Sequence, residues 1–258
     1  MSNIECTRSG ATQILRLSRP EKKNALSGKM YDALSDALEA GDRNADVAVH
    51  VVFGCNGVFT AGNDIGEFLA SSTGDQAVLK AVLRFIRLLP RIGKPMIAGV
   101  DGLAVGIGTT LLFHCDMVYA SPSARFQTPF LDLGLVPEAG SSLLMPARLG
   151  YARAFEMLVL GWAADATAMH SAGLVNAIVP GDELEAQVLD VAAQLARKPP
   201  AALAQARRLM RRDAEAVSRR TDEEAEIFAR QLQSAEAREA FQAFAEKRAP
   251  DFSKLHGG

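Results

Sequence analysis

The chain of 258 residues has few of the residues that form disulfides or bind metal ions. It contains three cysteines that lie far from one another and four histidines that are equally dispersed. None of them falls in the close pairs that zinc sites or small disulfide-bonded domains use. An odd, scattered set of cysteines is typical of reduced thiols in a cytoplasmic protein. We therefore expect no disulfide framework, no metal site and a cytoplasmic location.

The chain also lacks a strong net charge and a long apolar run. Its formal net charge is −2, which is too small to create a field that attracts nucleic acid or an anionic membrane. No stretch has the length and apolar character needed to span a bilayer. The first ten residues lack the basic and apolar regions of a signal peptide. Neither nucleic acid nor a membrane is an expected partner.

Hydrophobic residues make up 48% of the chain, which is enough for a large α/β core. In the first part of the sequence, β-branched runs alternate with segments of helical period. This alternation indicates βαβ units around a largely parallel sheet. The expected strands are residues 12–17, 47–53, 96–100 and 117–120, and the expected helices are residues 27–40 and 76–89. These elements assign residues 1–181 to one core unit.

After residue 181 the sequence becomes helical throughout, in blocks at 182–197, 200–212 and 221–247. Asp182 with Glu185 and Thr221 with Glu224 have the spacing of helix capping boxes. An apolar stripe runs along the first block. We therefore expect residues 182–258 to form a helical region that packs on the core or on a neighbouring subunit.

Two glycine-containing turns each follow a hydrophobic strand. The first reads Phe-Thr-Ala-Gly-Asn-Asp-Ile at residues 59–65, and the second reads Ala-Val-Gly-Ile-Gly at residues 104–108. A strand that ends in such a turn and enters a helix leaves backbone N–H groups free at the helix N-terminus. Those groups suit an anion, including the oxyanion that forms when a thioester loses an α-proton.

Taken together, several segments resemble the crotonase (enoyl-CoA hydratase/isomerase) superfamily. They are residues 17–26, 59–64, 94–108, 115–120, 124–126 and 134–140. The resemblance runs in order from about residue 12 to residue 180, and the helical tail agrees with it. It implies an α/β crotonase-like (ClpP/crotonase) fold, with a spiral ββα catalytic core and a C-terminal helical trimerisation region. It also implies a homotrimer or a dimer of trimers. The substrate would be an acyl-CoA, so that coenzyme A is part of the substrate and no separate cofactor is needed.

Carried onto this sequence, the resemblance implies an oxyanion hole made by the backbone amides of Asn63 and Ile107. The second position is often glycine in the family, and isoleucine there would narrow the pocket. The resemblance and the neighbouring motif residues give an expected substrate and CoA crevice made of Lys23, Ala25, Ala61, Gly62, Asp64, Ile65, Ala104, Val105, Gly106 and Phe130.

The acid–base residues decide which reaction follows the enolate. Hydratases of the family use two glutamates, and the corresponding positions here are Thr110 and Phe130. Glu138 remains, at the position where the family's Δ3,Δ2-enoyl-CoA isomerases carry a single glutamate. One carboxylate can remove a proton at C2 and return it at C4. Asp132 is the nearest rival carboxylate, and we expect it to face solvent.

The sequence therefore predicts an isomerase that converts 3-enoyl-CoA to 2-enoyl-CoA in fatty-acid or related acyl-CoA degradation, with Glu138 as the catalytic base. Two alternatives remain open. One is another crotonase-family enzyme, such as an enoyl-CoA hydratase that uses Glu138 with water. The other is an acyl-CoA-binding protein without turnover.

Overall fold

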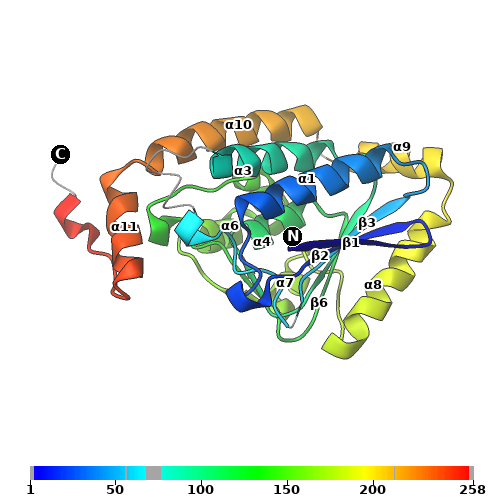
Figure 1. Cartoon of the computed structure of the whole chain (residues 1–258), viewed down its shortest axis with the longest axis horizontal. Helices are drawn as coiled ribbons and strands as arrows, with labels where there is room; N and C mark the ends of the chain where they lie inside the picture. Colours follow the sequence, from blue (N-terminus) through cyan, green and yellow to red (C-terminus); the bar gives the residue numbers. More distant parts are fainter. Residues whose placement is uncertain (1–2, 56, 68–76, 212, 256–258) are drawn as a thin grey trace.

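The computed structural model describes residues 3–55, 57–67, 77–211 and 213–255, and a six-stranded sheet runs through its centre (Figure 1). The strand order is β1-β2-β3-β4-β6-β9. The β1–β2 pair is antiparallel and the other pairs are parallel, as expected for βαβ connections. The strands are β1 (Ile4–Ser9), β2 (Thr12–Leu17), β3 (Val49–Phe53), β4 (Met96–Val100), β6 (Met117–Ala120) and β9 (Ala177–Ile178).

Helices cover both faces of this sheet. On one face α1 (Gly28–Arg43) packs against α3 (Ala77–Leu88), and α10 (Ala214–Gln231) lies along α3 (Figure 1). On the other face α8 (Gly181–Ala196) packs on β3 and β4. Every residue of β3 and β4 is buried, which explains why these strands read as continuous apolar runs without alternation.

A smaller sheet stands beside the first and carries one of the glycine turns. β5 (Leu103–Val105) pairs in parallel with β7 (Arg125–Gln127), which pairs antiparallel with β8 (Ala164–Asp165). β5 leads directly into the short helix α4 (Ile107–Thr110). The remaining helices are α5 (Ser141–Leu149), α6 (Tyr151–Leu158), α7 (Ala166–Ser171), α9 (Pro200–Met210) and α11 (Ala235–Ala245), and short 3₁₀ turns lie at Pro20–Lys22, Leu89–Arg91, Leu111–His114, Leu131–Leu133 and Phe252–Leu255.

The helical region departs from the sequence prediction in two ways. The block expected at 221–247 is two helices, α10 and α11, because Ser234 begins a new helix and its side chain accepts from the Ala237 N–H. Thr221 lies inside α10 and donates its hydroxyl to the Val217 carbonyl, so it is not an N-cap. Likewise α8 begins at Gly181 after Pro180, without a side-chain cap, and the predicted cap at Asp182 was wrong.

The division of the chain at residue 181 stays a prediction. α8 packs on the central sheet, whereas α11 lies at the other end of the molecule and packs on the turn Leu131–Leu133 (Figure 1). None of the helices in the described parts of the chain is long and apolar enough to cross a membrane.

Candidate active site

The buried residue Asn24 fixes the first glycine turn through hydrogen bonds made by its side chain and its backbone. Its side-chain nitrogen donates to the Val58 carbonyl at 2.7 Å, and the backbone carbonyl of Asn24 accepts from the Thr60 hydroxyl at 2.6 Å. Gly62 has φ +88°, and a Cβ there would lie 2.9 Å from the Val105 carbonyl oxygen. The turn therefore needs glycine, because both the backbone conformation and the close approach of β5 exclude a side chain.

The backbone N–H of Asn63 points away from the chain that supports the turn. The Leu26 N–H donates to the Gly62 carbonyl, and the Asp64 N–H donates to the Leu26 carbonyl. In a parallel bridge the residue between these two bonds directs its own N–H to the opposite side. Among the described residues, no acceptor is recorded for the Asn63 N–H.

Ile107 holds the matching place in the second turn. Gly106 is the N-cap of α4, with φ +56° and ψ −119°, a region that favours glycine strongly. Ile107 is the first residue of the helix, so its N–H has no partner within the helix. Within the described chain, its N–H has no recorded acceptor elsewhere either. The side chain of Ile107 is buried, so this residue offers its backbone amide and not its side chain.

Glu138 contacts Thr110, the last residue of the short helix that Ile107 begins. The Thr110 hydroxyl at the end of α4 donates to Glu138 Oε1 at 2.5 Å, and Glu138 is only 5% exposed. Burial is the main cause that raises the pKa of Glu138 to about 8; the Thr110 hydrogen bond acts in the opposite direction, and the charge of Glu224 acts in the same direction as burial. A carboxyl group with a pKa near neutrality is suited to take up and return a proton.

Hydrogen bonds to the residues that follow Glu138 fix the loop that carries it. Ala139 has φ +58° and is fully buried, and its carbonyl accepts from His114 Nε2 at 2.7 Å. Burial lowers the pKa of His114 to about 4, so the imidazole is neutral and acts as a donor here. Glu224 of α10 accepts from the Gly140 N–H at 2.6 Å and from the Ser142 N–H at 2.9 Å.

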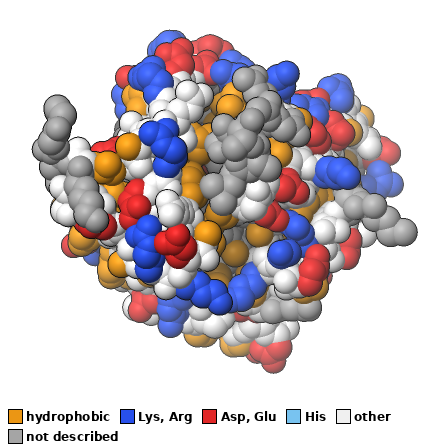
Figure 2. Space-filling view, turned by 60° about the vertical axis from the view of Figure 1, so that its left-hand side comes forward, with side chains coloured by type: hydrophobic (Ala, Val, Ile, Leu, Met, Phe, Trp, Pro, Cys, Tyr) orange, Lys and Arg blue, Asp and Glu red, His pale blue; other side chains and the backbone are white. Residues whose placement is uncertain are grey.

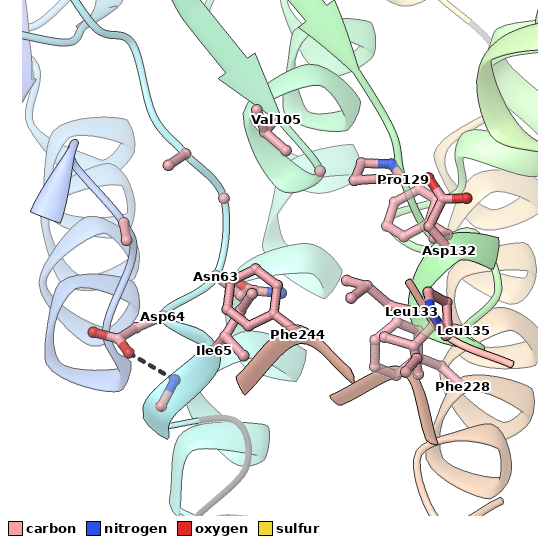
Figure 3. A pocket seen from close by; sticks show the side chains of 18 of the residues that line it. Asn63, Asp64, Ile65, Val105, Pro129, Asp132, Leu133, Leu135, Phe228 and Phe244 are labelled. Atoms are coloured by element: carbon pink, nitrogen blue, oxygen red, sulfur yellow. Dashed lines mark hydrogen bonds between the residues drawn. The ribbon is translucent and has the colours of Figure 1, made fainter. Parts of the chain in front are cut away.

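A cavity of about 660 Å³ opens in front of the first turn. Figure 2 shows this side of the molecule as a hollow with hydrophobic side chains on its floor and charged side chains around it. Figure 3 shows residues from both glycine turns facing Phe228 of α10 and Phe244 of α11 across the cavity. The cavity is lined by the predicted oxyanion-hole residue Asn63 and by most of the predicted crevice residues: Ala25, Ala61, Gly62, Asp64, Ile65, Val105, Gly106 and Phe130.

Two of the predicted crevice residues do not line the cavity. Lys23 has a left-handed backbone conformation (φ 49°) after the 3₁₀ turn, and Lys22 takes its place on the cavity wall. Ala104 is fully buried, and its carbonyl accepts from the Thr109 hydroxyl, so it supports the second turn from behind. Asp132 is exposed on the cavity wall.

A second, much smaller cavity of about 20 Å³ touches Glu138. Asn63 and Phe228 line this cavity and also the large one. Apart from Asn63 and Glu138, its lining is apolar: Leu79, Val82, Leu83, Ile86, Ala225 and Phe228. The buried carboxyl group therefore lies beside a small, mostly apolar space that shares Asn63 and Phe228 with the large cavity.

Sequence reasoning missed Tyr31, Glu224 and the aromatic residues of the C-terminal helices. Tyr31 is fully buried in α1, and its hydroxyl donates to Asn63 Oδ1. The helical period places position 31 on a face that packs in the core. A hydroxyl group on such a face needs a buried hydrogen-bond partner, and this was the sequence signal that could have pointed to Tyr31. Phe228 and Phe244 read as ordinary apolar positions, and nothing in the local sequence connects them to residue 63.

The comparisons with known proteins agree with this geometry. The family described as "Enoyl-CoA hydratase/isomerase" matches residues 7–255. The chain belongs to the enoyl-CoA hydratase/isomerase family. The crystal structure of a family member from Pseudoalteromonas atlantica T6c is 40% identical, with 97% of this chain and 100% of that chain covered and a TM-score of 0.91. The crotonase fold with C-terminal helices is thereby established.

The curated relatives include both hydratases and isomerases. A 2,3-dehydroadipyl-CoA hydratase of Escherichia coli is 32% identical over 98% of this chain and 99% of its own length. Enoyl-CoA delta isomerase 2 of Rattus norvegicus is 36% identical over 81% of this chain, which spans about half (54%) of that protein. The chain is thus an acyl-CoA enzyme of the crotonase superfamily, either a hydratase or an isomerase.

Proposed function

We propose that this enzyme is a Δ3,Δ2-enoyl-CoA isomerase with Glu138 as its catalytic base, acting in fatty-acid or related acyl-CoA degradation. The observation that carries the proposal is the buried carboxyl group of Glu138, which lines a small, mostly apolar cavity next to the first glycine turn. The positions where the family's hydratases carry glutamates hold Thr110 and Phe130. Phe130 has no acid–base group, and Thr110 donates its hydroxyl to Glu138.

The chemistry needs one base and one anion site. The Glu138 carboxylate removes a proton from C2 of the 3-enoyl-CoA, and the electron pair spreads over a dienolate whose negative charge rests largely on the thioester oxygen. The backbone amides of Asn63 and Ile107 donate to that oxygen. Glu138 then returns the proton at C4, the double bond moves to C2=C3, and the carboxylate is regenerated. No water takes part.

Hydration is the second candidate, because the E. coli relative named as a hydratase matches over nearly its full length. In that case Glu138 would activate a water molecule that adds to a 2-enoyl-CoA. The apolar lining of the small cavity favours isomerisation, since besides Glu138 it provides one polar side chain, Asn63. A bound water needs two to four polar partners, and Asn63 and Glu138 supply only the minimum of two.

The decisive assay incubates the purified protein with trans-3-hexenoyl-CoA. Conjugation of the double bond with the thioester increases ultraviolet absorbance, whereas hydration of trans-2-hexenoyl-CoA decreases it. We expect the increase with the first substrate and no decrease with the second. The reverse pattern would establish the hydratase.

The matching variant is Glu138→Gln, which keeps the shape of the side chain and removes the base. A general base contributes about 10²- to 10⁴-fold in rate, and we expect a loss of that size while the affinity for hexanoyl-CoA persists. Asp132→Asn, at an exposed carboxylate of the large cavity, should retain most of the activity. Full isomerisation by the Glu138→Gln enzyme would contradict the assignment. If the wild-type protein binds hexanoyl-CoA but exchanges no α-protons in D₂O, it is a binding protein without turnover.

We also propose that the enzyme assembles as a homotrimer or a dimer of trimers. Large apolar side chains are exposed at and after α6, where Tyr151 and Leu160 are each 73% exposed. At the end of α9, Leu209 is 78% exposed and Met210 is 81% exposed. Exposed apolar clusters of this kind are typical of surfaces that another chain covers.

A further inference from the structure

The side chain of Asn63 has a fixed orientation. The role proposed for this residue in the oxyanion hole uses only its backbone amide and does not require that orientation. The Tyr31 hydroxyl donates to Asn63 Oδ1. Among the described residues this oxygen is the one recorded acceptor for the Tyr31 hydroxyl, which has no contact with solvent. A buried hydroxyl without an acceptor is costly, so the oxygen of the carboxamide is held against Tyr31 and its nitrogen is turned the other way.

Tyr31 is itself well fixed. Its ring packs against Phe85 of α3, with 5.4 Å between the ring centroids, and burial raises the pKa of its hydroxyl. The hydroxyl is therefore neutral and can donate at any pH at which the enzyme works. A rigid donor on one side of the carboxamide removes the freedom of that side chain to rotate.

The free end of the carboxamide points into the large cavity. Figure 3 shows the nitrogen of Asn63 directed into the large cavity. Among the described residues, no acceptor is recorded for this nitrogen. Asn63 also lines both cavities, so its side chain lies where the thioester end of the acyl group must pass. An N–H donor at this point meets the reacting part of the ligand and not its distant ends.

We propose that the carboxamide of Asn63, positioned by Tyr31, is a third hydrogen-bond donor to the enolate and adds to the two backbone amides. This inference rests on the proposed function only in taking an acyl-CoA enolate as the ligand. A donor to a charged oxygen contributes about twice as much as a donor to a neutral one. The carboxamide should therefore bind the enolate more strongly than the neutral thioester, which is the condition for accelerating enolisation.

The experiment compares two ligands that need no turnover. Acetoacetyl-CoA binds an oxyanion hole as its enolate, and butanoyl-CoA binds as a neutral thioester. Titration calorimetry should show that Asn63→Ala weakens acetoacetyl-CoA about 10- to 100-fold and butanoyl-CoA only about threefold, in line with hydrogen bonds to charged and neutral acceptors. Asn63→Asp should weaken acetoacetyl-CoA further, because it places a carboxylate next to the enolate.

Tyr31→Phe keeps the packing against Phe85 and releases the carboxamide of Asn63. We expect the affinity for acetoacetyl-CoA to fall about threefold to tenfold, which is less than in Asn63→Ala, and the affinity for butanoyl-CoA to change less. Tyr119→Phe is the matched control: this tyrosine is also buried, but it belongs to the cluster beneath α8, and we expect no change in either affinity. Thermal unfolding and butanoyl-CoA binding report whether each variant is folded.

Two results would overturn the inference: equal weakening of the two ligands by Asn63→Ala, or no weakening of either. The isomerase proposal fails independently of this one. The Asn63 variants could lose affinity selectively for acetoacetyl-CoA while the wild-type protein does not isomerise trans-3-hexenoyl-CoA. That result would contradict the isomerase proposal and support the third donor. An active isomerase whose Asn63 variants show no selective loss of affinity for acetoacetyl-CoA would support the isomerase proposal and contradict the third donor.

Discussion

Glu138 combines a buried carboxyl group with a hydroxyl donor, and these two features set the pH range in which it can act as a base. Burial raises its pKa to about 8, and only the deprotonated form can accept the C2 proton. We expect kcat/KM for isomerisation to rise with pH up to about 8 and to level off above it. An acid limb near pH 4 to 5 would contradict this prediction.

Thr110→Val tests the cause of that pH dependence. The Thr110 hydrogen bond lowers the pKa of Glu138, so its removal raises the pKa and moves the acid limb to higher pH. Activity at pH 7 falls more than activity on the plateau. Thr109→Val is the matched control, because its buried hydroxyl donates to the Ala104 carbonyl and not to Glu138. The measurement is the profile of kcat/KM against pH for all three enzymes.

At the same scale, the roles of Asn63, Ile107 and Glu138 stay predictions that rest on motif position. Each of them lies in a segment with recognisable neighbours, and Glu138 accepts from Thr110, at the end of the helix that Ile107 begins. Tyr31 was not predictable in this way. Its partner is 32 residues away, and such a contact depends on how α1 lies against the first turn.

Among the helices and strands, the contact between α10 and α5 controls the Glu138 loop. Glu224 uses its two carboxylate oxygens for two different N–H groups, those of Gly140 and Ser142. In Glu224→Gln one oxygen becomes an NH₂ group, so one buried N–H loses its acceptor. We expect the free energy of unfolding to fall by about 1–3 kcal/mol in urea titrations.

The same substitution should also change the pH profile. The charge of Glu224 raises the pKa of Glu138, so its removal moves the acid limb to lower pH, opposite to Thr110→Val. Glu223→Gln, at the exposed neighbour paired with Arg220, should change neither quantity. A Glu224→Gln enzyme with wild-type stability and an unchanged acid limb would show that Glu224 neither stabilises the Glu138 loop nor raises the pKa of Glu138.

The strands of the central sheet were predictable because burial on both faces leaves an unmistakable apolar run. The predicted ranges 12–17, 96–100 and 117–120 match β2, β4 and β6. The edge strand β1 was missed because five of its six residues are exposed. The break between α10 and α11 was missed because Thr221 and Ser234 are both acceptable caps in sequence, and only packing buries the first inside a helix.

For the whole molecule, the trimer is the property to measure first. Sedimentation velocity should show a species of three times the 27.5 kDa chain mass, or of six times that mass. Leu160→Glu and Leu209→Glu each place a charge on one exposed apolar cluster, and we expect at least one of them to dissociate the assembly. A wild-type protein that sediments as a monomer at micromolar concentration would contradict the proposal. The order of the matching segments predicted the fold itself, whereas the exposed surface carries no comparable pattern.

The large cavity takes its walls from both ends of the chain, from Lys22 and Ala25 at one end and from Phe228 to Pro250 at the other. A nascent chain that has left the ribosome only as far as residue 220 already contains Asn63, Ile107 and Glu138. It still lacks Glu224, which clamps the Glu138 loop, and the aromatic wall opposite Asn63. We therefore expect a chain truncated after residue 220 to keep the strands of the central sheet but to lack the Glu224 contacts and the aromatic residues of the cavity wall.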